Sequence, residues 1–218
     1  KVASFAYKME YTFNMVVRSS FMSGVCVGIA GFGYLAERSI IGAVLFSFGL
    51  LTVVGYKLPL YTGTAGFIPL RDEQGRSCWL QAIGKLLFIL LGNITGCLLV
   101  SLLSRLSPID LGGAAQKILE GRLAIGPLRA GLLAIGCGFI MTTAVTFARQ
   151  GNNLPLLFGV PLFIVCGFPH CVADAFYYLC VPVDFWLQNI GDIALLYVCI
   201  VTGNFVGCNF YRWVAARF

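Results

Sequence analysis

Charged residues are scarce in this 218-residue sequence. Asp, Glu, Lys and Arg make up only 11% of it, whereas soluble domains usually have about 25%. This scarcity excludes a typical soluble domain, and the 59% of hydrophobic residues indicates an integral membrane protein. Because each crossing of a bilayer needs about 20 apolar residues, the chain has room for about six crossings and no separate soluble domain. We therefore predict one all-α transmembrane domain over residues 1–218.

Histidine is the scarcest ionisable residue, since His170 occurs alone, inside the apolar stretch 154–183. Burying such a group without a partner costs on the order of several kcal/mol, which makes it a candidate functional residue. Cys166 and Cys171 flank it, but these few ligands in an apolar setting do not form a zinc pattern. The other cysteines are interpreted mostly as small core residues. No metal or cofactor is expected.

Charges and turn residues divide the sequence into six apolar segments, at 16–35, 40–54, 86–103, 130–147, 154–168 and 193–213. The second and fifth segments are too short for a full crossing, and each runs into a stretch rich in Gly, Pro and polar residues. These stretches are residues 55–66 and 167–174. We predict that the second and fifth helices are broken there.

Two segments of the chain resemble each other. Gly92-Asn-Ile-Thr-Gly96 recurs as Gly203-Asn-Phe-Val-Gly207, 111 positions later, and Phe48-Gly49 recurs at a similar offset. Three spans in each half predict a 3+3 inverted repeat, over about 15–105 and 128–214, with a site between the broken helices. The glycines suit close helix packing, and Asn93 and Asn204 are expected to tie helices to loops.

The basic residues predict the orientation. With the N-terminus inside, nine lie in cytoplasmic segments and five outside, which favours both termini in the cytoplasm of a plasma or inner membrane. The net charge of +6 is thus a topology signal and no evidence for nucleic acid binding. The nine are Lys1, Lys8, Arg18, Arg71, Arg76, Lys85, Arg149, Arg212 and Arg217, and the five are Arg38, Arg105, Lys117, Arg122 and Arg129.

Four motifs together resemble the formate/nitrite transporter family. They are Leu60-Tyr-Thr-Gly63, the two Gly-Asn-x-x-Gly segments, and Gly167-Phe-x-His170-x-x-Ala173. The resemblance implies a homopentamer of aquaporin-like protomers in the lipid bilayer. Each protomer would conduct small monovalent anions such as formate, nitrite or hydrosulfide, or their acids.

The resemblance also implies roles for individual residues. Thr62 and His170 match the threonine and histidine that face each other at the midpoint of the family's pore. The remaining matches are a cytoplasmic constriction at Leu50 and Tyr61, an outer constriction at Phe46 and Phe163, and an outer vestibule at Arg122.

Four positions depart from the family pattern. Pro59 and Pro169 stand where the family usually has acids, Asp174 replaces an asparagine, and Lys57 replaces a small residue. These changes predict a rewired polar network behind the pore. In that network Lys57 could pair with Asp174.

A narrow apolar passage strips water from an anion, so polar donors must replace that water. Thr62 and His170 are the candidate donors. Desolvation disfavours an imidazolium, whereas an approaching anion favours it, so a proton could be shared with a weak acid in the pore. The half-helix that begins near His170 would add backbone N–H groups.

Several alternatives stay open. The substrate could be hydrosulfide or a short-chain monocarboxylate, and an aquaporin-like channel for neutral solutes would share the broken-helix plan. The sequence has no Asn-Pro-Ala pair for that last function. An enzyme is not expected, because only Cys166, Cys171 and Asp174 lie near His170 as catalytic partners. His170 could also be a core residue bonded to a backbone carbonyl, and the aromatic positions could be plain packing.

Overall fold

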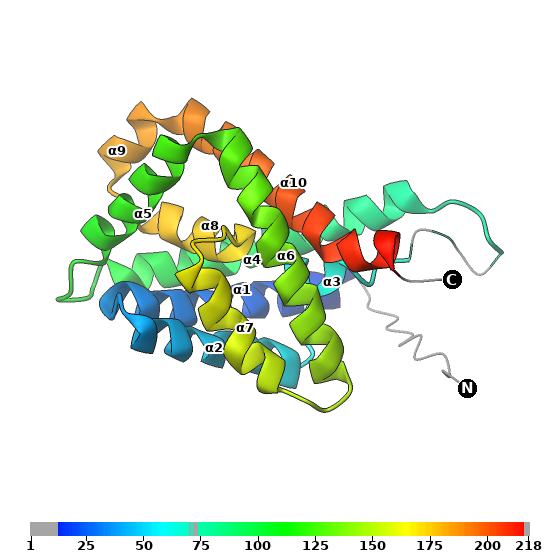
Figure 1. Cartoon of the computed structure of the whole chain (residues 1–218). Helices are drawn as coiled ribbons and strands as arrows, with labels where there is room; N and C mark the ends of the chain where they lie inside the picture. Colours follow the sequence, from blue (N-terminus) through cyan, green and yellow to red (C-terminus); the bar gives the residue numbers. More distant parts are fainter. Residues whose placement is uncertain (1–12, 70, 72–73, 216–218) are drawn as a thin grey trace.

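The protein is helical, as the composition predicted. A computed structural model describes residues 13–69, 71 and 74–215. Within these ranges the only β-type pairing is an isolated bridge between Arg71 and Ser77. Lys1, Lys8 and Arg217, which contributed to the charge argument, lie outside the described residues. The helices are α1 Phe13–Ala36, α2 Ile40–Gly55, α3 Tyr61–Ala65, α4 Trp79–Ser104, α5 Leu111–Ile125, α6 Pro127–Arg149, α7 Leu154–Val165, α8 Cys171–Cys180, α9 Val183–Gln188 and α10 Ile190–Val214 (Figure 1).

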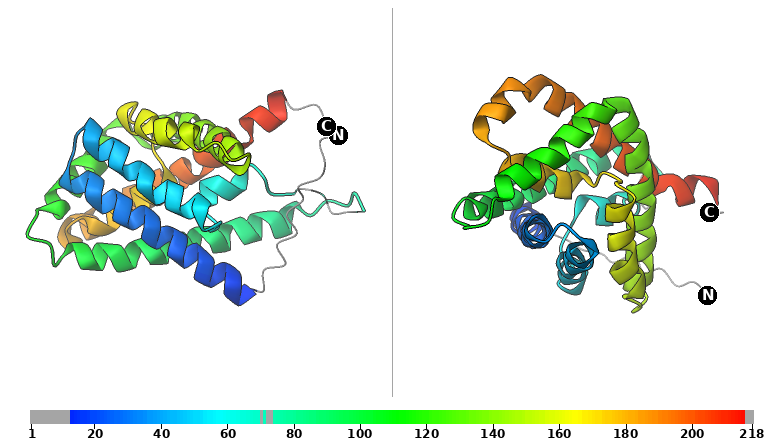
Figure 2. Two further views of the ribbon diagram at one scale, coloured as in Figure 1. Left: turned by 90° about the horizontal axis from the view of Figure 1, so that it is seen from below. Right: turned by 60° about the vertical axis from the view of Figure 1, so that its left-hand side comes forward.

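Among the described residues, four helices, α1, α4, α6 and α10, are long and apolar enough to cross a bilayer. They contain the first, third, fourth and sixth apolar segments of the sequence. The shorter apolar helices are α2, α7 and α8. This pattern is that of a multi-pass integral membrane protein. The helix α1 begins and α10 ends at the same end of the molecule (Figures 1 and 2).

The long helices pack in two pairs, α1 with α4 and α6 with α10. Glycines allow each pair to approach closely. A Cβ on Gly96 would collide with the Phe21 carbonyl, and a Cβ on Gly207 would collide with the Ile135 carbonyl. The repeated Gly-x-x-x-Gly segments therefore act in helix packing, as such motifs do in other membrane helices.

The second and fifth apolar segments are interrupted, in the regions where the sequence predicted breaks. After α2 the chain leaves the helix over residues 56–60 and then forms the short α3, and after α7 it does so over 166–170 and then forms α8. The helices α2 and α7 pack against each other. The Ser47 hydroxyl donates to the Leu157 carbonyl at 3.3 Å between them.

Both interruptions begin with the same backbone turn. Lys57 has φ 56° and Gly167 has φ 67°, which places both in the left-handed region. The N–H of Leu58 donates to Val53, and the N–H of Phe168 donates to Phe163, each at 2.9 Å. These bonds close the last turns of α2 and α7 in the Schellman arrangement, whose left-handed position favours glycine.

Two helices, α5 and α9, were not predicted from the sequence. The helix α5 packs against α8, beside the second interruption. Its start is marked by Asp110, whose carboxylate accepts the Gly113 N–H at 2.9 Å. Leu111, Ala115 and Leu119 are buried at a spacing of four residues along its inner face.

Candidate functional site

The two interruptions meet at a side-chain contact. Thr62, in α3, places its Oγ1 2.9 Å from Nε2 of His170, the residue before α8. Both side chains are fully buried, with exposed fractions of 0% and 1%. The contact joins residues 108 positions apart and lies where the starts of two short helices converge. The start of a helix is the positive end of its dipole, so α8 directs positive potential to this point.

The second nitrogen of His170 fixes the ring's protonation pattern. Nδ1 accepts the Ala173 N–H at 3.2 Å and thereby caps α8. A nitrogen that accepts a hydrogen bond carries no proton, so the proton of the neutral ring is on Nε2. Nε2–H then donates to Thr62, and the Thr62 hydroxyl keeps its own proton for another acceptor. The backbone partner of His170 is thus an N–H, not the carbonyl of the core-residue alternative.

Two buried asparagines hold the interruptions in place. The side-chain oxygen of Asn93 accepts the Tyr61 N–H at 3.0 Å, and its amide donates to the carbonyls of Ser20 and Pro59. In the other half, the side-chain oxygen of Asn204 accepts the Cys171 N–H at 2.8 Å.

The amide of Asn204 donates to the carbonyls of Ala134 and Pro169. Each asparagine thus links one long helix to its neighbour, to an interruption, and to the start of a short helix. Pro59 and Pro169 contribute only their carbonyls to these bonds. The two asparagines make the same kind of network in both halves of the chain.

Aromatic rings adjoin His170 on one side. The Phe163 ring stacks on the imidazole with centroids 5.5 Å apart, and Phe46 meets Phe163 edge to face at 6.2 Å. Leu50 is also buried, and the Tyr61 hydroxyl donates to the Val201 carbonyl at 3.3 Å. Phe46 and Phe163 are therefore in contact, while Tyr61 is tied to α10.

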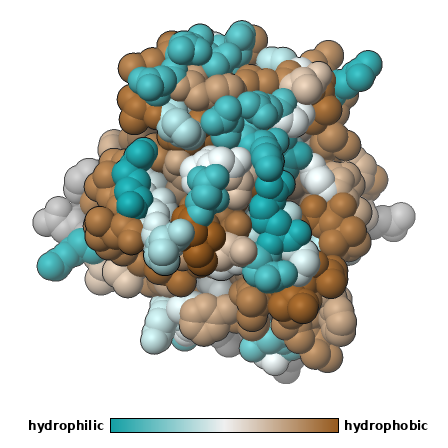
Figure 3. Space-filling view, turned by 90° about the vertical axis from the view of Figure 1, so that its left-hand side faces the viewer, coloured by the Kyte–Doolittle hydropathy of each residue, from teal (hydrophilic) through white to brown (hydrophobic). Residues whose placement is uncertain are grey.

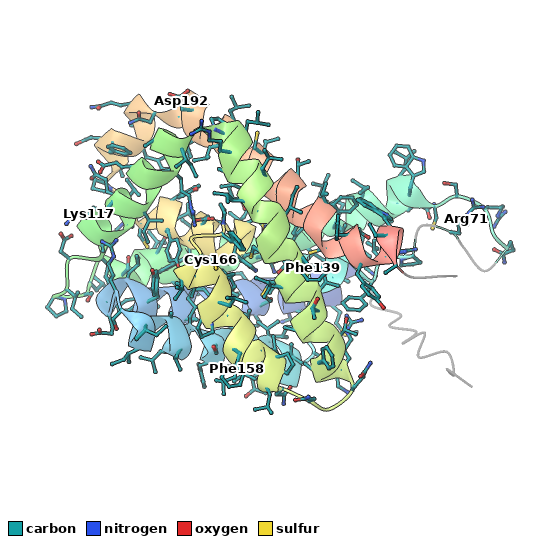
Figure 4. The ribbon with its side chains drawn as sticks, in the orientation of Figure 1. Arg71, Lys117, Phe139, Phe158, Cys166 and Asp192 are labelled. Carbon is teal, nitrogen blue, oxygen red and sulfur yellow. The ribbon has the colours of Figure 1, made fainter. Side chains whose placement is uncertain are left out.

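A cavity of about 380 Å³ reaches His170 from the end of the molecule that carries α5. Hydrophilic residues gather on this end, whereas hydrophobic residues lie at its flanks (Figure 3). Lys117 lies at this end, and Arg71 lies at the opposite one (Figure 4). The lining includes Lys117, Arg122, Phe163, His170, Asp174 and Tyr177. The cavity therefore presents cations near its mouth and an imidazole at its inner end.

The acid in this cavity pairs with Arg122, and the expected pairing of Asp174 with Lys57 is wrong. Arg122 Nε lies 3.6 Å from Asp174 Oδ1, and another guanidinium nitrogen donates to the Gly167 carbonyl. The packing of α5 on α8 brings these residues together. Lys57 is exposed at the end of α2. Arg122 lies at the cavity, where the resemblance placed a vestibule residue.

Within the described residues, no group of three or more His, Cys, Asp and Glu could hold a metal ion. Cys171 is buried beside His170, whereas Cys166 is exposed at the turn after α7 (Figure 4).

The sequence signature described as "Formate/nitrite transporter" matches residues 2–217. The chain belongs to the formate/nitrite transporter family. Among curated relatives, it is similar to the formate channel FocA of Haemophilus influenzae, with 25% identity over 183 residues, covering 72% of this chain and 64% of that protein. FocA of Escherichia coli K12 is 26% identical over 148 residues, covering 63% of this chain and 52% of that protein. The chain thus spans between about half and two thirds of these relatives' length.

Solved structures share the family's fold. A structure described as a pentameric formate channel with formate bound superimposes with a TM-score of 0.75 and 20% identity, covering 92% of this chain and 94% of that one. A channel described as an FNT family ion channel gives a TM-score of 0.73 and 21% identity, covering 92% and 90%. At these identities the likeness shows the fold.

Sequence reasoning did not identify Lys117, Tyr177 or the Gly167 carbonyl as part of the cavity. All three come to it because α5 covers α8. The signal for α5 was present in the capping residue Asp110 and in the four-residue spacing of buried positions that follows it. At 15 residues α5 is shorter than a membrane span, so the pattern of long apolar runs does not predict it.

Proposed function

We propose that this formate/nitrite transporter conducts small monovalent anions, or their weak acids, through a passage centred on Thr62 and His170. The observation that carries this proposal is the buried Thr62–His170 contact, at the convergence of two short helices and at the inner end of a cavity that cations line. Formate and nitrite are the first candidate substrates, since the chain is similar to formate channels. Hydrosulfide and short-chain monocarboxylates are alternatives of the same chemical class.

The architecture proposed for this passage is a 3+3 inverted repeat in one channel domain over residues 1–218, with repeats at about 15–105 and 128–214. Two observations support it. Asn93 and Asn204 make matching bonds to the two interruptions, and Lys57 and Gly167 take the same left-handed conformation. A homopentamer is proposed because a similar structure is described as pentameric. Both termini are proposed to lie in the cytoplasm, as the basic residues favour.

The chemistry of the site suits an anion that has lost its water. The Thr62 hydroxyl accepts the hydrogen bond from His170 Nε2–H, which leaves its own hydrogen free to be donated to the anion. The N-terminal end of α8 adds positive potential through the helix dipole. The hydroxyl and the helix end replace the water that the anion has lost. Neither carries a full charge, so the anion is not held too tightly for conduction. A weak acid that arrives with its proton can cross as a neutral molecule.

Apolar groups would control access to the donors. Phe46 and Phe163 are proposed as an outer constriction, because Phe163 lines the cavity and stacks on the imidazole at its inner end. Leu50 and Tyr61 are proposed as the constriction on the other side of Thr62. An apolar constriction excludes hydrated ions while a dehydrated anion or neutral acid passes.

Flux into proteoliposomes tests the proposal. Vesicles with and without the protein are given formate, nitrite, hydrosulfide, acetate, lactate and glycerol, and uptake is followed by stopped flow. The proposal expects protein-dependent flux of at least one anion and none of glycerol. Glycerol flux without anion flux would indicate a neutral-solute channel and would overturn it.

A further inference from the structure

Arg122 and Asp174 face each other in the outer cavity without a complete set of hydrogen bonds. Their closest charged atoms are 3.6 Å apart, which is longer than a hydrogen bond. Arg122 Nε and both carboxylate oxygens of Asp174 have no hydrogen-bond partner in the described part of the chain. Asp174 is only 1% exposed, and both residues line the cavity that leads to His170.

This arrangement is unusual for a buried ion pair. Buried charges are normally matched by several hydrogen bonds, because desolvation otherwise outweighs their attraction. A guanidinium can bind a carboxylate through two parallel N–H groups, yet one arm of Arg122 is instead taken by the Gly167 carbonyl. The pair thus has donors and acceptors left over, next to a cavity with room for a small ion.

We propose that Arg122 and Asp174 form an anion-exchange site, in which a small planar oxyanion replaces the Asp174 carboxylate as the partner of Arg122. This inference rests on the proposed function and adds a binding step between the cavity mouth and His170. The Asp174 side chain ends in a carboxylate, the same group that formate consists of. Permeant anion and side chain therefore compete for the same donors.

The chemistry of Arg122 gives this site a preference. A guanidinium offers a planar fork that matches two oxygens, so formate, nitrite and short carboxylates fit it. Chloride lacks that shape and interacts only as a point charge. Lys117, at the same cavity, is a point charge too and attracts all anions alike. Arg122 therefore accounts for the preference for oxyanions, whereas Arg122 and Lys117 both attract anions in general.

Asp174 helps the anion to leave Arg122 in this scheme. A channel must release its ion as well as bind it, and an anion held on a bare buried arginine would leave slowly. The tethered carboxylate returns to Arg122 as the anion moves inward, which weakens anion binding and aids release. Removing the carboxylate should therefore tighten binding of free oxyanions.

The test measures the melting temperature of purified protein in detergent against sodium formate, with sodium chloride at equal ionic strength as the reference. Wild type, Asp174→Asn, Lys117→Gln and the double variant Arg122→Gln/Asp174→Asn are compared. In Asp174→Asn the half-saturating formate concentration should fall about tenfold, which corresponds to about 1.4 kcal/mol. Lys117→Gln should keep the preference for formate over chloride. The double variant should lose it.

Three results would overturn the inference: an unchanged half-saturation in Asp174→Asn, an equal response to chloride, or a formate preference that persists in the double variant. A purely structural ion pair would give a lower melting temperature in Asp174→Asn that formate does not restore. If Asp174→Asn does not fold, Arg122→Lys replaces it, because an ammonium lacks the fork. Formate and chloride should then act alike, and a remaining formate preference would contradict the inference.

Flux data separate this inference from the proposed function. The protein could conduct anions into proteoliposomes while its preference for formate does not depend on Arg122. That result would overturn the exchange site but not the channel function. Formate binding that depends on Arg122, with no anion flux, would overturn the channel function while the binding site remains.

Discussion

Thr62 Oγ1 and His170 Nε2 are 2.9 Å apart although 108 residues separate them in the sequence. Each residue lies where a short helix begins after an interruption, and each interruption is fixed by a buried asparagine. The contact is therefore the product of matching local structures in two halves of the chain. The direction of this hydrogen bond is fixed, since the cap on Nδ1 leaves the ring proton on Nε2, from which it is donated to Thr62.

Removing the Thr62 hydroxyl tests the hydrogen bond from His170 to Thr62. In Thr62→Val, the buried Nε2–H of His170 loses its acceptor, which costs about 1–3 kcal/mol of stability. One donor for the anion is lost as well. We expect a lower melting temperature in detergent and reduced formate uptake into vesicles.

Thr62→Ser is the matched control, since it keeps the hydroxyl and removes only a methyl group. It should retain most of the uptake and stability. Equal losses in Thr62→Ser and Thr62→Val would assign the effect to packing of the methyl group, and the hydrogen bond would then be unimportant.

The two asparagines should contribute similarly to stability. Asn93→Ala and Asn204→Ala each leave a buried backbone N–H and two carbonyls without their side-chain partner, and buried unsatisfied groups cost about 1–3 kcal/mol each. Both variants should melt well below the wild type. Asn153→Ala is the control, because Asn153 is exposed and its side chain makes no capping bond. A large loss in only one of the two asparagine variants would count against their equivalence.

The left-handed turns after α2 and α7 should differ in their tolerance of substitution. Lys57 has a side chain where glycine is favoured, and the left-handed conformation costs other residues about 1–2 kcal/mol. Lys57→Gly should therefore melt above Lys57→Ala, since both remove the lysine side chain and only glycine relieves the backbone. Gly167→Ala should melt below the wild type. Identical melting of Lys57→Gly and Lys57→Ala would show that this turn carries no backbone cost.

Much of the scaffold could be predicted from the sequence because membrane helices follow simple physical rules. Long apolar runs predicted α1, α4, α6 and α10, and short runs followed by Gly and Pro predicted interruptions after α2 and α7. The repeated Gly-Asn-x-x-Gly segments pointed to close packing, because a Cβ at Gly96 or Gly207 would collide with a neighbouring backbone. These signals are local, so a single sequence contains them.

The partner of Asp174 could not be predicted in this way. It depends on how α5 lies across α8, a tertiary relationship with no fixed spacing in the sequence. Lys57 was expected to pair with Asp174 because both residues depart from the family pattern, and two such changes can compensate each other. It lies instead at the exposed end of α2, and Arg122 reaches Asp174 from α5, which is not a membrane-span pattern in the sequence.

We expect His170 to act in transport and not only as a helix cap. Uptake of formate into proteoliposomes is measured over a series of external pH values for wild type, His170→Asn and His170→Phe. Wild-type uptake should rise as the pH falls, because protons accompany the anion or enrich its neutral acid. His170→Asn should fold, since asparagine can still cap α8, but its pH profile should change because an amide does not titrate.

His170→Phe should block uptake, since it places another apolar ring beside Phe163 and removes a donor. Melting temperatures of both variants establish that the protein is folded. A changed pH profile in His170→Asn together with lost uptake in folded His170→Phe is the result that we expect. Wild-type rates and pH profiles in both variants would show that His170 is only a buried capping residue.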